Sequence, residues 1–190
     1  MKKHLITAFL MTIATTVLLG VIYPLLITAL AQVLFKDKAN GQLITRNGQA
    51  VGSRIIAQPF TSPKYFHPRP SAAGNGYDAA NSGGTNFAPT NQKLIDRIQA
   101  DAKTLHEENP SQPIPVDLLT TSASGLDPEI SPAAAEFQVP RVARARGIPE
   151  NTIRDLVQKY TYQRDLGLLG EVRVNVLELN LALDDLAAKP

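Results

Sequence analysis

Hydrophobic residues dominate the start of the chain and then give way to short, interrupted patterns. No charged side chain lies between His4 and Lys36, and the run from Leu5 to Phe35 is mostly Leu, Ile, Val, Ala and Thr. As a helix this run would be roughly 46 Å long at ~1.5 Å per residue, which exceeds the ~30 Å hydrocarbon core of a bilayer. The pattern therefore predicts one membrane-spanning helix, with residues 1–36 as an anchor and residues 37–190 as a soluble domain.

Two features within the apolar run modify this prediction. Pro24 lacks a backbone N–H and crowds the preceding turn, so we expect a kink near Tyr23. Small side chains share overlapping faces of the helix and would let another helix approach closely, although plain exposure to lipid is the alternative. These small residues are Ala8, Thr12, Thr15, Thr16 and Gly20.

The N-terminus also resembles a secretion signal. Lys2 and Lys3 form a charged start, and residues 29–31 read Ala-Leu-Ala, which is the small-x-small pattern of a cleavage site. The apolar run is longer than the about 7–15 residues of a signal peptide, so we favour a retained anchor. Lys36 and Lys38 follow the run, so the positive charges on its two sides balance. The signal-anchor character favours a cytoplasmic N-terminus and an extracytoplasmic domain.

A hairpin is the first element expected in the soluble part. Residues 43–51 flank Asn47-Gly48, a pair that supplies the two positive φ angles of a type I′ turn. Residues 53–57 are expected to extend the second strand.

The segment that follows is rich in turn-forming residues. Ser62-Pro63 resembles a helix start and predicts a short helix through Phe66. Residues 67–91 are mainly Gly, Asn, Ser, Ala and Pro, and so long a segment is either disordered or functional. We expect an ordered loop held by Tyr77 and Phe87.

Apolar spacing and capping signals predict four helices in the rest of the chain. They cover residues 90–108, residues 131–138 with an interruption at Pro140, residues 149–160, and a last helix after Asn175. Gly147 is a good C-cap, and residues 171–174 fit a short strand. The fold class expected is α+β, with a single transmembrane helix and a mostly helical soluble domain that contains one β-hairpin.

Composition argues against several classes of function and site. The formal net charge is only +2, which argues against a nucleic-acid partner. The chain contains no cysteine, which excludes disulfides, thiol nucleophiles and cysteine zinc sites.

Few residues offer recognisable chemistry. No phosphate-binding loop of the G-x-x-x-x-G-K-[ST] type occurs, although Ser82-Gly83-Gly84 could present backbone N–H groups to an anion. Ser122 or Ser124 with His67 would be needed for a hydrolase, but the G-x-S-x-G elbow is absent.

Two further clusters carry polar groups. Residues 120–128 are small and hydroxylated and could build a network of side-chain to backbone bonds. His67 could pack against Asp127 or Glu129. Three arginines within one and a half helical turns could bind carboxylates of a partner or anionic lipid, or simply be solvated. They are Arg141, Arg144 and Arg146.

Several segments together resemble the C subunit of the Kdp-type potassium-transporting P-type ATPase. They are residues 52–58, 65–72, 82–86, 117–135, 138–147 and 174–180, of which 117–135 is the strongest. The likeness covers nearly the whole chain, and the apolar N-terminal helix lies where that family has one.

This resemblance implies a non-catalytic accessory subunit of a four-part complex in the bacterial inner membrane that imports potassium. The implied partners are a channel-like potassium-translocating subunit, a P-type ATPase subunit, a small single-helix peptide and membrane lipid. ATP and potassium are then handled by the complex, and no cofactor or metal is expected on this chain. The family is also described as a catalytic chaperone that raises the affinity of the pump for ATP.

The matched segments contain the candidate site residues. A direct nucleotide site would use Ser82, Gly83, Gly84 and Asn86. Partner contacts or a structural motif would involve His67, Arg69, Ser71, Thr121, Ser122, Ser124, Asp127, Arg141 and Arg144.

The outward placement and direct ATP binding conflict, because ATP is cytoplasmic. An external domain can change ATP affinity only through a coupling free energy across the membrane. We favour contact with the translocating subunit near its ion entrance. Direct nucleotide binding on the cytoplasmic side and a tethered extracytoplasmic hydrolase remain the alternatives.

Overall fold

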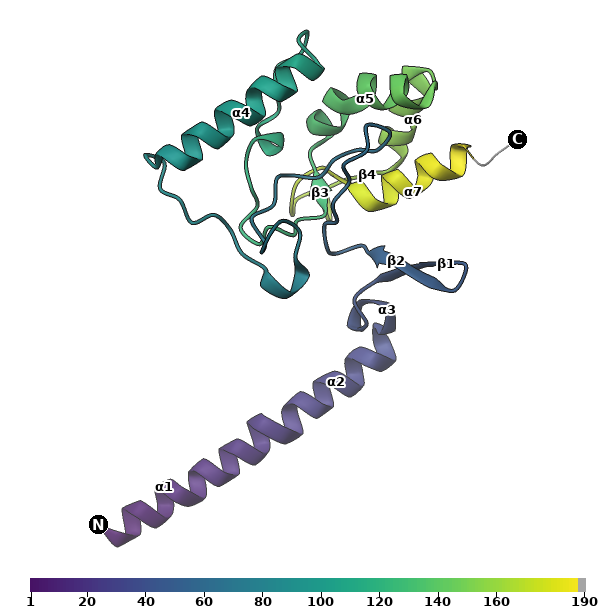
Figure 1. Cartoon of the computed structure of the whole chain (residues 1–190). Coiled ribbons are helices and arrows are strands. Elements are labelled where there is room, and N and C mark those ends of the chain that lie inside the picture. The colour runs from purple at the N-terminus through teal and green to yellow at the C-terminus, as the bar shows by residue number, and fades with distance from the viewer. Residues whose placement is uncertain (188–190) are drawn as a thin grey trace. The chain divides into compact units, whose positions relative to one another are not determined.

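The computed structural model describes residues 1–187 and divides into two compact units, residues 1–43 and the rest of the chain from Ile44 (Figure 1). The first unit is a continuous helix, Lys2–Leu34, with a mean hydropathy of 2.3 and no buried residue. By length and composition it can cross a membrane, as predicted. A short helix of one turn, α3 (Lys36–Ala39), follows the long helix within the first unit.

The long helix changes its hydrogen-bond pattern directly before Pro24, and the kink expected near Tyr23 stays a prediction. Three segments follow one another: α1 (Lys2–Thr15), a π-helical segment (Thr16–Ile22) and α2 (Tyr23–Leu34). Because proline cannot donate to the preceding turn, the hydrogen-bond register widens directly before it.

Hydroxyl groups of the long helix bond to its own backbone. Thr7, Thr12 and Thr15 donate to the carbonyls of Lys3, Ala8 and Met11 at 2.8–2.9 Å. These bonds remove the cost of placing hydroxyl groups in hydrocarbon.

The predicted hairpin is confirmed. β1 (Leu43–Arg46) and β2 (Gln49–Ser53) are joined by Asn47 and Gly48, whose φ angles are 53° and 78°. The second strand ends at Ser53, so the predicted extension to Ala57 is wrong. The chain turns there, with the Ile56 N–H donating to the Ser53 carbonyl at 3.4 Å, and the Ala57 N–H then donates to the carbonyl of Leu126 at 2.9 Å.

A three-stranded antiparallel sheet organises the remainder of the second unit. Its order is β3 (Glu129–Ile130), β5 (Arg173–Asn175) and β4 (Thr161–Tyr162), with Val174 paired to Ile130 on one side and Thr161 on the other. The expected short strand near 171–174 is therefore present, shifted by one or two residues.

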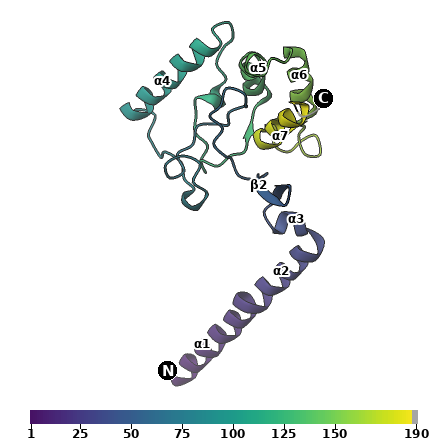
Figure 2. The ribbon, with the colours of Figure 1, turned by 45° about the vertical axis from the view of Figure 1, so that its right-hand side comes forward.

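Three helices pack together beside this sheet, and a fourth lies on the other side of the unit in both ribbon views (Figures 1 and 2). The three helices that pack together are α5 (Pro132–Arg146), α6 (Glu150–Lys159) and α7 (Val176–Ala187), and the fourth is α4 (Gln92–Glu108). The largest fully buried apolar side chains include Phe66, Phe137, Ile153, Leu179 and Leu183. The α+β prediction is confirmed.

The predicted interruption at Pro140 is wrong, because α5 runs through it to Arg146. Proline inside a helix costs about 3 kcal/mol. Val139 and Val142 on either side are fully buried, and their packing offsets this cost. Gly147 then ends the helix in the left-handed conformation, as predicted.

The segment from residue 62 to 91 is ordered but less regular than predicted. A single turn, with the Tyr65 N–H donating to Ser62 O, replaces the helix expected at 62–66. The loop that follows contains a 3₁₀ turn, Ala79–Asn81. Another 3₁₀ turn, Val116–Leu118, lies after α4. Tyr77 holds the loop by donating to the Arg69 carbonyl, and Phe87 is 40% exposed.

Candidate functional site

Two buried amide side chains hold the backbone of residues 66 and 67. The Asn180 amide accepts from the Phe66 N–H at 2.8 Å and donates to the Phe66 carbonyl at 2.9 Å. Gln138 does the same for His67, at 2.8 and 3.2 Å. Both amides are about 1% exposed. This irregular segment therefore obtains from α5 and α7 the hydrogen bonds that a neighbouring strand would supply.

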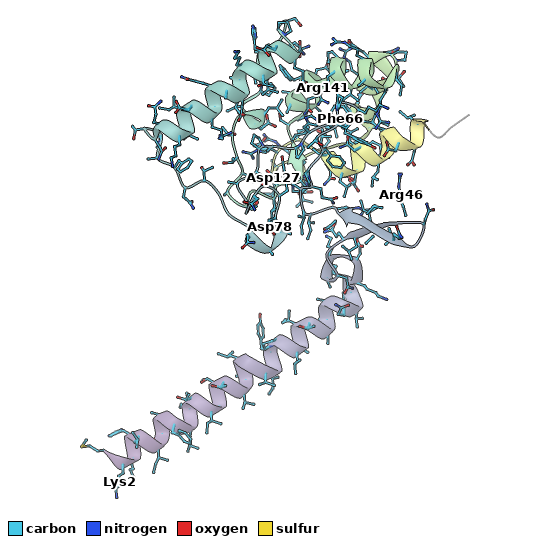
Figure 3. All side chains as sticks on the ribbon, in the orientation of Figure 1. Lys2, Arg46, Phe66, Asp78, Asp127 and Arg141 are labelled. Carbon is cyan, nitrogen blue, oxygen red and sulfur yellow. The ribbon has the colours of Figure 1, made fainter. Side chains whose placement is uncertain are left out.

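Arg141 secures the same segment (Figure 3). Its guanidinium pairs with Glu108 at 2.7 Å and donates to Gln138 Oε1 at 2.6 Å. Two further bonds of 2.8 Å reach the carbonyls of Pro63 and Tyr65. Because the side chain is enclosed and its donors are used, Arg141 connects α4, α5 and the 63–67 segment.

The arginine cluster of α5 therefore does not form one outward face. Arg146 pairs with Asp184 at 2.8 Å, donates to the carbonyls of Lys64 and Leu183, and lies 4.9 Å from the Tyr65 ring centre. Arg144 is exposed.

Arg69 joins the long loop to residues 120–128. Its guanidinium contacts Asp127 at 3.1 Å, the hydroxyl of Thr120 at 3.3 Å and the carbonyls of Thr120 and Thr121 at 3.3–3.4 Å. This spread of planar donors suits arginine, whose fork reaches several acceptors at once.

Replacing Arg69 by lysine should therefore lower the free energy of unfolding by about 1–2 kcal/mol, since an ammonium cannot reach all of these acceptors. Urea titration of the full chain in mild detergent measures this. Arg144→Lys is the matched control, because Arg144 is exposed. Equal stability of the two variants would contradict the role of Arg69.

Ser71, Tyr77 and Gly125 complete this junction. The Ser71 hydroxyl donates to the Gly125 carbonyl at 2.6 Å and accepts from the Tyr77 N–H at 2.8 Å. The Tyr77 hydroxyl donates to the Arg69 carbonyl at 2.8 Å, and burial raises the pKa of this phenol to about 12. Tyr77 therefore stays a protonated donor across the physiological range.

The Ser82–Gly84 segment is used within the same junction. The Gly83 N–H and the Ser82 hydroxyl both donate to the Ser124 carbonyl, at 2.8 and 3.0 Å. Gly84 packs so closely that an added Cβ would lie 3.0 Å from the Ala123 carbonyl oxygen. Asn86 follows with a φ of 53°. The Gly83 N–H and the Ser82 hydroxyl are therefore used within the fold.

The serines and His67 belong to separate hydrogen-bond groups. Ser122 Oγ lies 3.4 Å from Ser124 Oγ, while His67 Nε2 lies 3.1 Å from the Ser62 carbonyl oxygen. Within residues 1–187, no hydrogen bond joins His67 to either serine.

The carboxylates expected near His67 have other partners. Asp127 pairs with Arg69, and Glu129 pairs with Arg173 at 3.1 Å. His67 instead lines a groove of about 320 Å³ with Tyr77, Glu108 and other side chains.

Burial, followed by the positive charge of Arg141, lowers the pKa of His67 from its ordinary value of 6.5. The unfolded chain therefore takes up a proton at a pH where the folded chain does not, and stability falls as the pH drops below about 6.5. We expect wild type to lose stability between pH 7 and pH 5.5 more steeply than His67→Gln, which removes the titrating ring. Parallel slopes in urea titrations would contradict this.

Comparison with known proteins decides the family. The model of the family described as "KdpC: K+-transporting ATPase, c chain" matches residues 5–185. The chain belongs to the KdpC family. The resemblance inferred from the sequence is thereby confirmed, and the chain has an accessory role in a potassium pump complex.

Individual relatives agree over their full length. A chain from Koribacter versatilis is 67% identical over 190 residues, which cover 100% of this chain and 98% of the relative. One from Methylobacterium nodulans is 52% identical over 201 residues, covering 100% of both. One from Acidobacterium capsulatum is 55% identical, covering 97% of this chain and 99% of the relative. Each relative is named "Potassium-transporting ATPase KdpC subunit". These names agree with the resemblance that the sequence showed.

Sequence reasoning missed Gln138, Asn180 and the inward role of Arg146. A signal existed for the two amides, because Gln138 lies between Phe137 and Val139 and Asn180 lies between Leu179 and Leu181. A lone amide in an apolar helical stretch indicates a buried polar group that needs a partner.

Proposed function

We propose that this chain is a non-catalytic subunit that stabilises the potassium-translocating and ATP-hydrolysing subunits from the extracytoplasmic side. One observation carries the proposal. The hydroxyl and imidazole groups that the sequence offered for catalysis or nucleotide binding are hydrogen-bonded within the domain; they belong to Ser82, Ser122, Ser124 and His67. A domain whose polar groups are internally satisfied is suited to rigid support.

The anchor is suited to association inside the bilayer. Thr12 and Thr15 donate to the carbonyls of Ala8 and Met11, four residues earlier in the helix, and so present small, satisfied surfaces. Small residues on one face let another helix approach closely. The translocating subunit, the ATPase subunit and the small single-helix peptide are the helical partners we propose, with lipid covering the remaining faces.

Any increase in ATP affinity then arises by coupling. The domain would bind the complex more tightly in the conformation that binds ATP better, and linkage requires ATP to strengthen its attachment by the same factor. Potassium and ATP are handled by the other subunits in this proposal.

Thiol labelling in intact cells tests the placement. The chain has no cysteine, and Gly83 has no atom within 4 Å of an added Cβ, so Gly83→Cys introduces one tolerated thiol. We expect a membrane-impermeant maleimide to label Gly83→Cys in intact cells with a permeable outer membrane. His4→Cys should react only after the inner membrane is permeabilised.

The reverse labelling pattern would place residues 82–86 in the cytoplasm and favour direct nucleotide binding. Labelling of both positions from outside would indicate a leaky preparation, which a cytoplasmic marker enzyme detects. Each variant is first shown to co-purify with the ATPase subunit.

A further inference from the structure

A small turn of the second unit exposes three leucines. Leu166, Leu168 and Leu169 are 90%, 82% and 62% exposed. They lie between β4 and β5, and no other exposed large hydrophobic residue of the second unit, within the described residues, reaches the exposure of Leu166. Apolar clusters exposed to water indicate an interaction site.

The turn is held rigidly. Asp165 and Leu169 exchange backbone hydrogen bonds of 2.8 and 2.9 Å, and the Gly167 N–H donates to the Arg164 carbonyl at 3.1 Å. Leu166 has a φ of 53°, which is unfavourable for leucine. A strained, exposed leucine in an ordered turn suits a preformed contact, because little conformational freedom is lost on binding.

Charges at the base of the turn are paired. Arg164 bonds to Glu171 at 2.6 Å, and Arg173 contacts Asp165 at 3.3 Å and Glu129 at 3.1 Å. The turn therefore lacks the unpaired cations that attract a loop to anionic lipid headgroups.

A groove of about 700 Å³ adjoins the turn and shares Asp165 and Gly170 with it. Five carboxylates and two guanidinium groups line this groove. The carboxylates belong to Asp117, Asp127, Glu129, Asp165 and Glu171. The excess of negative charge in the groove repels an anionic bilayer surface and attracts a positively charged protein surface.

We propose that the leucine turn, residues 165–170, docks into an apolar socket on a partner subunit of the pump, next to a lysine or arginine that enters the acidic groove. The inference rests on the proposed function and adds which surface makes the contact and what chemistry the partner presents. An apolar centre with a charged rim is the usual anatomy of a protein–protein contact.

A triple variant tests the leucines: Leu166→Asn, Leu168→Ser and Leu169→Thr. Asparagine tolerates the positive φ of residue 166, so the full chain in detergent should melt no lower than wild type. The amount of partner subunits recovered per tagged chain from mildly solubilised membranes should fall about tenfold. Ile55→Asn is the matched control, because Ile55 is a half-exposed aliphatic residue of the same unit, and it should recover partners as wild type does.

Photocrosslinking identifies the occupant. Leu168→benzoylphenylalanine in the assembled complex should give an adduct with the mass of the chain plus one partner subunit. An adduct of two copies of this chain, a lipid adduct, or no adduct would each overturn the proposal. Arg144→benzoylphenylalanine reports on another exposed surface of the domain.

Different results would overturn the docking role of the leucines and the proposed function. If the triple variant recovers as much of the partner subunits as wild type does, only the docking role of the leucines is overturned. Recovery of the wild-type chain without any partner overturns the proposed function and this inference together.

Discussion

Replacing Asn180 by leucine should lower the free energy of unfolding of the domain by about 2–5 kcal/mol. Leucine has nearly the same shape but would leave the N–H and C=O of Phe66 buried without partners, and each unsatisfied buried group costs about 1–3 kcal/mol. The two bonds of 2.8 and 2.9 Å and the 1% exposure of Asn180 make the full penalty apply.

The measurement is a urea titration of the full chain in mild detergent, followed by circular dichroism of the domain. Asn151→Leu is the matched control, because Asn151 lies exposed near the start of α6, and its replacement should change stability by less than about 0.5 kcal/mol. Similar midpoints for the two variants would show that the Asn180 amide does not hold residue 66.

Replacing Gly125 by alanine should be at least as damaging, with a loss of about 3–5 kcal/mol. Gly125 has a φ of 67°, and an added Cβ would lie 2.7 Å from Ala73 N and 2.7 Å from Gly83 O. These neighbours are backbone atoms of the long loop, so the two loops would have to separate. We expect limited proteolysis to cut residues 67–91 faster in this variant.

Gly147→Ala separates backbone strain from crowding. Gly147 has the same φ of 67° but no atom within 4 Å of an added Cβ. It should therefore show only the left-handed penalty, about 1–2 kcal/mol. If the two alanine variants were equally stable, the close packing of the loops at Gly125 would be unsupported.

Sequence predicted the elements whose signals are local. The Asn47-Gly48 turn and the Gly147 end of α5 both depend on a few neighbouring residues, and both are present. The break predicted at Pro140 failed because burial of Val139 and Val142 outweighs a local preference.

The site was harder to predict, because its contacts join distant segments. Arg141 is separated by more than seventy positions from the carbonyls of Pro63 and Tyr65 that it binds. Nothing in its helical spacing distinguishes it from the exposed Arg144 three residues later. Only the folded arrangement of α4, α5 and residues 62–67 shows which arginine turns inward.

The link between Phe66 and Asn180 also has a consequence for the order of folding. The two residues are 114 positions apart in the chain. Contacts between such distant positions form slowly. The backbone of Phe66 obtains its two side-chain hydrogen bonds only when α7 has packed against it, so we expect this closure to be among the slow steps of folding.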